Sequence, residues 1–299
     1  MSVWLPTAPC TPEDCVAAPG PAVGPAVRAA RCAGCAALLV AGVALMPLVR
    51  ALRPRSREAA VRLWARLLLG SLGVRLRVTG DGPGAPAGRT GGALLAANHV
   101  SWLDILLVAA VRPGRMLAKA EVRRWPLLGP LAARGGTVFL DRDGLRALPG
   151  TVAEVAASLG RGERVAVFPE GSTWCGRGGG RFRPALFEAA VRSGAAVEPV
   201  AIRYTAADGA PTTVAAFVGD DGLLPSLGRV VASRGLVAEL VLLPAIPAGR
   251  HGGRRELARA AQAAVRAGLA VPAAAGAGRA ATPAVVRPPR RVLRPARSA

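Results

Sequence analysis

The sequence predicts an α/β fold: a mixed sheet flanked by helices, preceded by an N-terminal two-helix segment that associates with membranes. The sheet is predicted by short apolar runs that alternate with helical stretches beyond Val74. The N-terminal segment is predicted by one apolar and one amphipathic stretch ahead of that alternation. A chain of 299 residues has room for a single core of this kind with extensions at both ends.

Composition divides the chain into four parts. Residues 1–27 are rich in Pro, Ala and Gly without an apolar period, so we expect a disordered leader. Residues 28–75 hold the two expected helices, and residues 76–270 hold the expected α/β domain. Residues 271–299 carry six arginines and no acid, which predicts a disordered basic tail. This tail either binds an anionic leaflet or is simply solvated.

The first expected helix contains a 17-residue apolar run at positions 33–49, between two groups of arginines. About 17 residues is the lower limit for crossing a hydrocarbon core of ~30 Å, and Pro47 would weaken the last turn. The second helix, residues 57–75, has apolar side chains at helical spacing with arginines between them. We expect the pair to contact a membrane, by spanning it or by lying on its surface. The alternative is that both helices pack on the protein's own core.

The later elements are expected in alternation. Strands are expected at residues 92–97, 136–140, 164–168, 197–204, 213–218 and 236–243. Helices are expected at residues 103–111, 145–159, 184–193 and 254–269. Sites in open α/β sheets form at the carboxyl ends of the strands, so functional residues are expected in the segments that follow the strands.

Composition and charge favour a lipid partner. Hydrophobic residues make up 52% of the chain and the mean hydropathy is positive. The net charge of +21 favours anionic partners such as acidic lipid headgroups on a membrane surface. Nucleic acid is not expected, because aromatic residues are only 4% of the chain and no base-reading motif is evident. The five cysteines are too sparse for a disulfide framework, which fits a reducing cytoplasmic setting.

His99 is the candidate for proton transfer. It is one of two histidines, and it follows the expected strand 92–97 and precedes the expected helix 103–111. This order places it at the carboxyl end of a strand. His251 lies instead in a turn with no acid immediately around it. A histidine base needs a second group that fixes its tautomer.

Asp104 can supply that group, although a simpler explanation competes. Ser101 suits the N-cap of the helix, and Asp104 three residues later suits the reciprocal capping acid. Five residues on an ideal helix turn about 140°, so His99 meets Asp104 only if it lies outside the helix and folds back over the first turn. We expect that arrangement. Ser101 lacks a Gly-x-Ser-x-Gly elbow, so we expect it to cap the helix and not to act as a nucleophile.

Four sequence blocks occur in order. They are Asn98-His99 with four residues to Asp104; Lys119-Ala120-Glu121-Val122 with Trp125-Pro126-Leu127-Leu128-Gly129, leading to Gly136-Thr137-Val138-Phe139-Leu140-Asp141-Arg142; Phe168-Pro169-Glu170-Gly171-Ser172-Thr173; and Val197-Glu198-Pro199-Val200-Ala201-Ile202. Together they resemble the glycerolipid (lysophospholipid) acyltransferase family, typified by bacterial 1-acyl-sn-glycerol-3-phosphate acyltransferase. The resemblance covers roughly residues 74–243.

The resemblance implies roles for four residues. His99 would be the general base, Asp104 its orienting partner, and Arg142 and Glu170 would bind the acceptor. A planar guanidinium such as that of Arg142 suits a phosphate. Only its place in the second sequence block distinguishes Arg142 from an ordinary surface arginine. Glu170 would bind the glycerol hydroxyl or hold an arginine, and the sequence leaves both open.

The third block also contributes to the expected acceptor site. Gly171 supplies a turn, the backbone amides of Gly171 and Ser172 are possible anion donors, and Thr173 completes the block. Trp174 stands where family members often carry an arginine. Phosphate recognition then depends on other arginines, or the headgroup is not a simple phosphomonoester. The nearby arginines are Arg177, Arg181 and Arg183.

The resemblance implies that a fatty acyl group moves from acyl-CoA or acyl carrier protein to the free hydroxyl of a lysophospholipid. The preferred acceptor is 1-acylglycerol-3-phosphate, whose acylation gives phosphatidic acid. A lyso-ornithine lipid or another lysolipid is the alternative. A non-catalytic basic membrane-binding protein and a lipid hydrolase are alternative classes.

We expect no metal and no cofactor beyond the acyl donor, because neither a zinc-type Cys/His pattern nor a dinucleotide-binding glycine loop is evident. The expected location is the cell membrane, with the catalytic domain on the cytoplasmic face.

Overall fold

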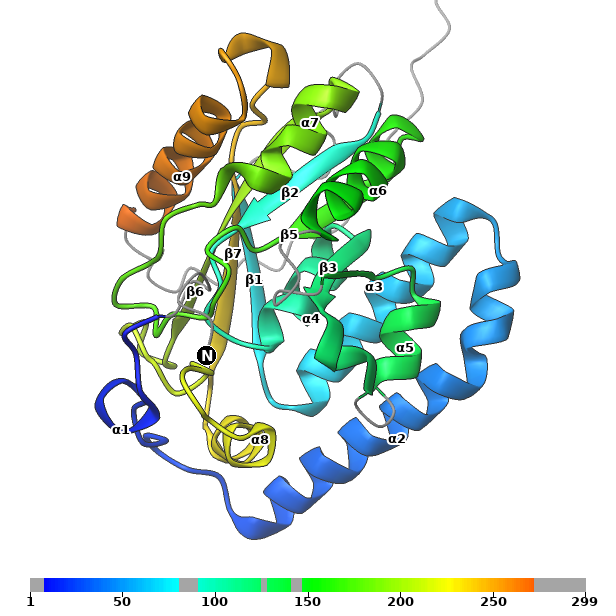
Figure 1. The fold of residues 1–299 in the computed structure, drawn as a ribbon. Coiled ribbons are helices and arrows are strands. Elements are labelled where there is room, and N and C mark those ends of the chain that lie inside the picture. The colour runs from blue at the N-terminus through cyan, green and yellow to red at the C-terminus, as the bar shows by residue number, and fades with distance from the viewer. Residues whose placement is uncertain (1–7, 81–90, 125–127, 141–146, 272–299) are drawn as a thin grey trace, which may run out of the picture.

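One twisted mixed sheet organises the molecule (Figure 1). The computed structural model describes residues 8–80, 91–124, 128–140 and 147–271. Within them seven strands lie in the order β1-β7-β6-β2-β5-β3-β4. Neighbours are parallel except β6 and β7. The strands are β1 (Arg75–Gly80), β2 (Ala93–Ala97), β3 (Arg115–Lys119), β4 (Val138–Leu140), β5 (Arg164–Val167), β6 (Ala196–Thr205) and β7 (Val237–Leu242). The predicted fold class is confirmed.

Helices cover both faces of the sheet (Figure 1). The α-helices are α1 (Pro12–Cys15), α2 (Pro25–Ala51), α3 (Pro54–Ser71), α4 (Leu103–Val111), α5 (Leu128–Arg134), α6 (Leu148–Gly160), α7 (Phe187–Ser193), α8 (Leu223–Ala232) and α9 (Arg254–Ala270). Short 3₁₀ helices are η1 (Ala120–Arg124), η3 (Pro184–Leu186) and η4 (Ala248–Arg250). Proline at the first position of α2 and α3 starts both helices without losing a hydrogen bond.

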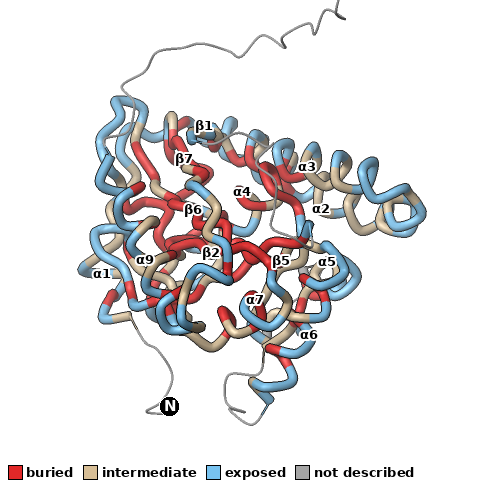
Figure 2. The backbone as a smooth tube through the Cα atoms, turned by 90° about the horizontal axis from the view of Figure 1, so that it is seen from above, coloured by how far each residue is buried: buried red, intermediate tan, exposed pale blue. Residues whose placement is uncertain are grey.

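The sheet separates two hydrophobic cores, and strand β2 contributes to both. Leu95 packs with residues of α3, α4 and α8, whereas Leu94 packs with residues of α6, α7 and α9. This alternation is the two-residue period of a strand buried on both faces. Figure 2 shows the buried residues concentrated in this central layer. The carboxyl end of β2 therefore lies at a fixed position between two packed helical layers.

The N-terminal segment differs from the prediction of a disordered leader over residues 8–27. Val23 donates its backbone N–H to Ala232 at the end of α8, at 2.9 Å, and the amide of Ala17 donates to Oγ1 of Thr213 at 3.0 Å. Cys10 is buried against the domain. These residues have a defined conformation in the structure because their few apolar side chains are buried by segments distant in sequence. Residues 1–7 and the expected tail beyond Val271 lie outside the described residues, as does Arg142.

Helices α2 and α3 form an antiparallel hairpin whose tip projects from the domain (Figures 1 and 2). Helix α2 is longer than the expected apolar run and continues through Pro47. Trp64 on α3 donates its indole N–H to the carbonyl of Leu38 on α2 at 2.8 Å. The helices approach closely there, since a Cβ on Gly42 would lie 2.8 Å from the Trp64 ring. The predicted two-helix segment is therefore present.

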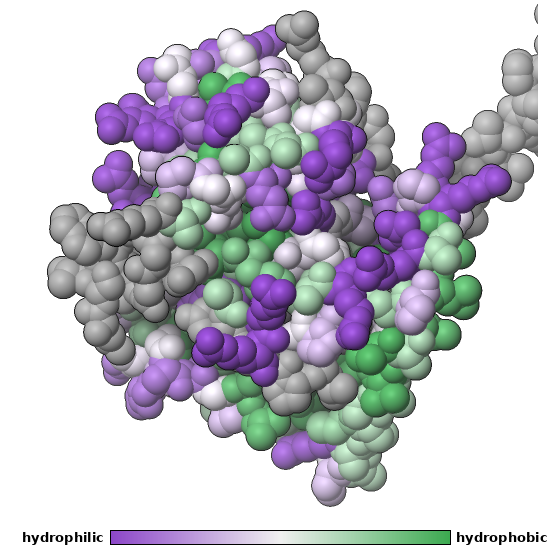
Figure 3. Space-filling view, turned by 45° about the vertical axis from the view of Figure 1, so that its right-hand side comes forward, coloured by the Kyte–Doolittle hydropathy of each residue, from purple (hydrophilic) through white to green (hydrophobic). Residues whose placement is uncertain are grey.

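Apolar side chains remain exposed on α2, among them Val40, Leu45 and Leu48. Figure 3 shows apolar residues gathered along the flank where this helix runs. By length and composition α2 is able to cross a membrane, two properties that it shares with signal sequences and with the core helices of soluble proteins. Its exposed apolar flank favours contact with lipid over packing on the protein's own core.

The expected strand at residues 213–218 is wrong. The segment is largely buried, but its backbone turns, with the N–H of Ala216 donating to Thr213 and that of Phe217 donating to Val100. An apolar run predicts burial, and burial is satisfied here by a turn that covers the start of the His99 loop. Strands β1 and β3 and helix α8 were not among the expected elements, because charged residues in the strands and proline in the helix obscure their periods.

Candidate active site

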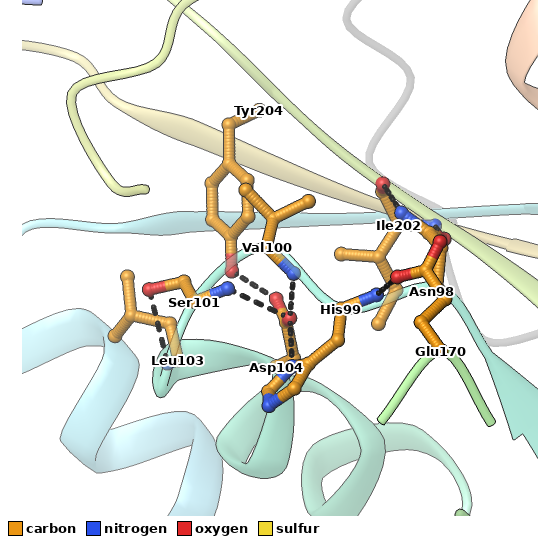
Figure 4. Close-up of polar contacts among 9 residues, drawn as sticks. All are labelled: Asn98, His99, Val100, Ser101, Leu103, Asp104, Glu170, Ile202 and Tyr204. Carbon is orange, nitrogen blue, oxygen red and sulfur yellow. Dashed lines mark hydrogen bonds and ion pairs between the residues drawn. The ribbon is translucent and has the colours of Figure 1, made fainter. Parts of the chain in front are cut away.

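The candidate site begins where β2 ends, in the loop that leads into α4 (Figure 4). The side chain of Asn98 fixes this loop to strand β6. Its Nδ2 donates to the carbonyl of Ile202 at 2.9 Å, and its Oδ1 accepts from the amide of Ile202 at 2.8 Å. The asparagine side chain thus continues the β2–β6 pairing by one position, and the next residue, His99, leaves the sheet at a defined point.

His99 and Asp104 meet as the sequence led us to expect. Nδ1 of His99 lies 2.8 Å from Oδ2 of Asp104. The same oxygen accepts the backbone N–H groups of Val100 at 2.7 Å and Ser101 at 2.9 Å. The histidine is outside α4 and folds back over its first turn, as Figure 4 shows. Asp104 therefore has both of the roles considered for it: it caps the helix by accepting amides at its start, and it also holds the imidazole.

The other oxygen of Asp104 is held by a residue that the sequence did not reveal. The hydroxyl of Tyr204 on β6 donates to Oδ1 at 2.6 Å. Both side chains are buried, Asp104 completely. Every oxygen of this buried carboxylate therefore has a donor, which burial requires. Burial, with the nearby Asp104 charge next, raises the pKa of Tyr204 well above its ordinary value, so the phenol stays protonated and donates.

The geometry fixes the tautomer and the direction of His99. A carboxylate only accepts, so Nδ1 carries the proton and Nε2 has the free lone pair. The ring stacks on Phe168, with centroids 3.9 Å apart and planes 12° apart. The side chain is 17% exposed, and Nε2 has no hydrogen-bond partner in the described part of the chain. An oriented basic nitrogen at an accessible surface is what general-base catalysis requires.

Glu170 is part of the framework beneath the histidine. Its Oε2 accepts the backbone N–H of His99 at 2.9 Å, and its Oε1 accepts that of Gly180 at 3.0 Å. The side chain is buried. Burial raises the pKa of Glu170 to about 7, although the two backbone donors act in the opposite direction and the Asp104 charge adds to the rise. These contacts are with backbone amides, and a role of Glu170 in binding the acceptor stays a prediction.

The third sequence block forms a turn beside the histidine. Gly171 adopts a left-handed conformation with φ of 77°, and its amide donates to Phe168 at 3.1 Å. This hydrogen bond engages one of the two amides that were expected to bind an anion. Ser172 and Thr173 follow and are half-buried. Trp174 then donates its backbone N–H to the carbonyl of His99 at 2.8 Å, so the block is tied to the catalytic loop from both ends.

Comparison with known proteins identifies the family. The chain is 41% identical over 215 residues to a lyso-ornithine lipid O-acyltransferase from Pseudomonas aeruginosa, covering 71% of this chain and 79% of the relative. The chain belongs to the acyltransferase family. The acyltransferase family model matches residues 77–203, which include His99, Asp104 and Glu170.

Other relatives of this acyltransferase carry a different substrate name. It is 38% identical over 187 residues to a 1-acyl-sn-glycerol-3-phosphate acyltransferase from Neisseria gonorrhoeae, covering 62% of this chain and 71% of the relative. The crystal structure of the 1-acyl-sn-glycerophosphate acyltransferase from Thermotoga maritima superposes with a TM-score of 0.61 at 21% identity, covering 82% of this chain and 93% of that one. At that identity the match supports the fold alone. The acyltransferase is thus of the lysolipid type, and two acceptors are named among its relatives.

Sequence reasoning missed two features of the acyltransferase. Tyr204 was missed although it is the chain's one tyrosine and occurs in an apolar strand, where a buried hydroxyl needs a partner. The pairing of Asn98 with Ile202 was missed because it joins residues 104 positions apart. Neither contact has a signal in local spacing.

Proposed function

We propose that the acyltransferase moves a fatty acyl group from acyl-CoA or acyl carrier protein to the free hydroxyl of 1-acylglycerol-3-phosphate, giving phosphatidic acid. The observation that carries this proposal is the His99–Asp104 pair, with Nδ1 held at 2.8 Å and Nε2 free in the described residues. A binding protein would not need an oriented base above a buried carboxylate. The acceptor is argued from charge, since the net charge of +21 suits an anionic headgroup.

The proposed chemistry follows from that pair. Nε2 of His99 takes the proton of the acceptor hydroxyl as its oxygen attacks the thioester carbonyl. The tetrahedral intermediate then collapses, the carbon–sulfur bond breaks, and the leaving thiolate receives the proton from the imidazolium. Asp104 holds the ring and stabilises the imidazolium charge between these two steps. Glu170 fixes the loop on which His99 lies, through the amide of His99.

A lyso-ornithine lipid is the second candidate acceptor. Two observations favour it: the Pseudomonas aeruginosa relative carries that name, and Trp174 stands where family members often have an arginine. If the acceptor is instead 1-acylglycerol-3-phosphate, its phosphate would be bound without an arginine at position 174, by Arg142 and by arginines of the loop that Glu170 anchors at Gly180. These are Arg177, Arg181 and Arg183.

We further propose that the enzyme is located at the cell membrane with its catalytic domain on the cytoplasmic face. The exposed apolar flank of α2 supports membrane contact. The cysteines in the described structure are free thiols, which suits a reducing compartment.

An assay with purified full-length protein tests the proposal. Lysophosphatidate and lyso-ornithine lipid are each supplied with acyl-CoA or acyl carrier protein as donor, and the acylated product is measured. We expect His99→Ala to lower kcat/KM by about 10²–10⁴-fold, the contribution of a positioned base. His251→Ala, which removes the chain's other histidine, should retain full activity. Full transfer by His99→Ala would contradict the mechanism, and faster acylation of lyso-ornithine lipid would contradict the preferred acceptor.

A further inference from the structure

Three cysteines that are far apart in the sequence converge beside the candidate active site. Cys10 and Cys15 come from the N-terminal segment, at the start and end of the turn that contains α1. Cys175 comes from the loop that follows Thr173. Their sulfur atoms all lie within 4.8 Å of one another, and all three are free thiols. Cys10 and Cys175 are buried, while Cys15 is half-exposed and opens the cluster to solvent.

The spacing suits a tetrahedral thiophilic ion. Two thiolates bound to zinc at ~2.3 Å with a tetrahedral angle stand about 3.8 Å apart. The three sulfur atoms therefore need to move by no more than about 1 Å to share one ion. Three protein ligands leave a fourth position for water or a small thiol, as in zinc sites that are not closed. The half-exposed Cys15 supplies an entry path for the ion.

The chemistry of the three sulfur ligands indicates which ion fits the cluster, because a thiol that binds a metal does so as the thiolate. Thiolate ligands select soft ions such as zinc over magnesium or calcium.

We propose that Cys10, Cys15 and Cys175 form a zinc site that fastens the N-terminal segment to the active-site loop. One side of the site is the segment that leads into α2. The other side is the loop residue next to Trp174, whose amide holds the carbonyl of His99 at 2.8 Å. The ion takes no part in acyl transfer and instead links the N-terminal segment to the loop beneath the histidine.

Metal binding is measured on the purified full chain, reduced, freed of metal with a chelator and then dialysed against zinc chloride. We expect one tightly held zinc per chain in the wild type and in Cys32→Ser, whose cysteine is exposed on α2 and away from the cluster. Cys10→Ser, Cys15→Ser and Cys175→Ser should each retain less than about a tenth of that zinc under the same competing chelator. Equal zinc in Cys175→Ser and Cys32→Ser would overturn the proposal.

A second measurement does not depend on variants that could misfold. Cobalt(II) chloride added to the metal-free wild type should produce thiolate-to-cobalt charge-transfer absorption and tetrahedral ligand-field bands, and zinc should abolish both. The wild-type Tm should rise with zinc concentration, whereas that of Cys15→Ser should not. Absence of the cobalt bands would overturn the proposal. A second result would also overturn it: a Cys10–Cys175 or Cys15–Cys175 disulfide that forms in air, together with a protein that binds no zinc after this disulfide is reduced. The cluster would then be a redox pair.

Discussion

At the scale of single residues, the site is defined by how one carboxylate is used. Asp104 accepts two backbone amides, an imidazole and a phenol, and all these donors lie within five residues of it except Tyr204. A capping acid needs only the amides. The extra contacts with His99 and Tyr204 go beyond those of an ordinary helix start and hold the imidazole in one orientation.

Removing the Tyr204 hydroxyl should weaken both stability and catalysis. In Tyr204→Phe, Oδ1 of buried Asp104 loses its donor at 2.6 Å, which should cost about 1–3 kcal/mol of unfolding free energy. We expect kcat to fall by about tenfold with little change in KM, because His99 is held less firmly. Denaturant unfolding and steady-state kinetics measure the two effects. Thr205→Val removes a neighbouring hydroxyl of β6 and should leave kcat unchanged; equal losses in both variants would contradict a specific role.

Glu170 should make stability depend on pH. Its pKa of about 7 in the folded protein lies above the ordinary value of 4.5, so the folded state binds more protons between these values. The stabilisation is complete below about pH 4.5 and is lost as pH rises through 7, by up to about 3 kcal/mol. Thermal unfolding of the wild type should therefore shift downward across this window, and Glu170→Gln should flatten the dependence. Glu188→Gln, on the surface of α7, should keep the wild-type slope, and a slope unchanged in Glu170→Gln would refute the assignment.

At the scale of elements, secondary structure was predicted well where one period dominates. Helix α4 (Leu103–Val111) has the expected bounds, and α9 differs by one residue at its end. The segment 213–218 shows the limit: its apolar run predicts burial correctly but not its turns, because its hydrogen bonds go to distant residues such as Val100. Strand β1 was missed because arginines alternate within it. Local pattern therefore predicted the strands that carry the site, β2, β5 and β6, and missed β1 and β3, in which charged residues interrupt the apolar period.

Close packing of the α2–α3 hairpin should depend on Gly42. A Cβ there would lie 2.8 Å from the Trp64 ring, so Gly42→Ala must displace the indole and its hydrogen bond to Leu38. We expect a loss of about 1–3 kcal/mol in unfolding free energy. Gly70→Ala is the matched control, because its Cβ would meet open space on α3 and alanine favours a helix. That variant should be stabilised slightly; destabilisation of both variants by the same amount would show that the hairpin contact does not matter.

At the scale of the whole molecule, the predicted architecture was correct, but the contacts between segments distant in sequence were not predicted. Three of the four sequence blocks include or follow the carboxyl end of a strand, the fourth lies within β6 beside β2, and the sheet brings them together. The N-terminal segment was expected to be free because its apolar residues are few. It docks because Cys10 and Val23 meet partners 165 and 209 positions away, and Arg31 at the start of α2 bonds to residues 200 and 202 positions away, which no local period encodes.

Membrane binding should depend on the exposed flank of α2. Leu45 is 53% exposed on this helix, and Leu45→Arg should weaken binding to anionic vesicles by about tenfold. The added charge alone would strengthen such binding, so a decrease must come from lost apolar contact. Val191→Arg adds the same charge on α7 and should bind at least as well as the wild type. Vesicle flotation measures both; undiminished binding of Leu45→Arg would show that α2 is not the contact.

The hairpin also bears on which leaflet of the membrane can supply lysolipid to the enzyme. The chain leaves the domain along α2 and returns along α3, and α3 carries Glu58 and Arg62, which are costly in a hydrocarbon core. At the base, Arg31 donates to the carbonyls of Val231 and Ser233, which holds the start of α2 to the domain. A hairpin whose two ends both lie at the domain keeps the sheet beside one leaflet. The enzyme would then draw its lysolipid from that leaflet alone, and lysolipid in the opposite leaflet would have to flip before it could be acylated.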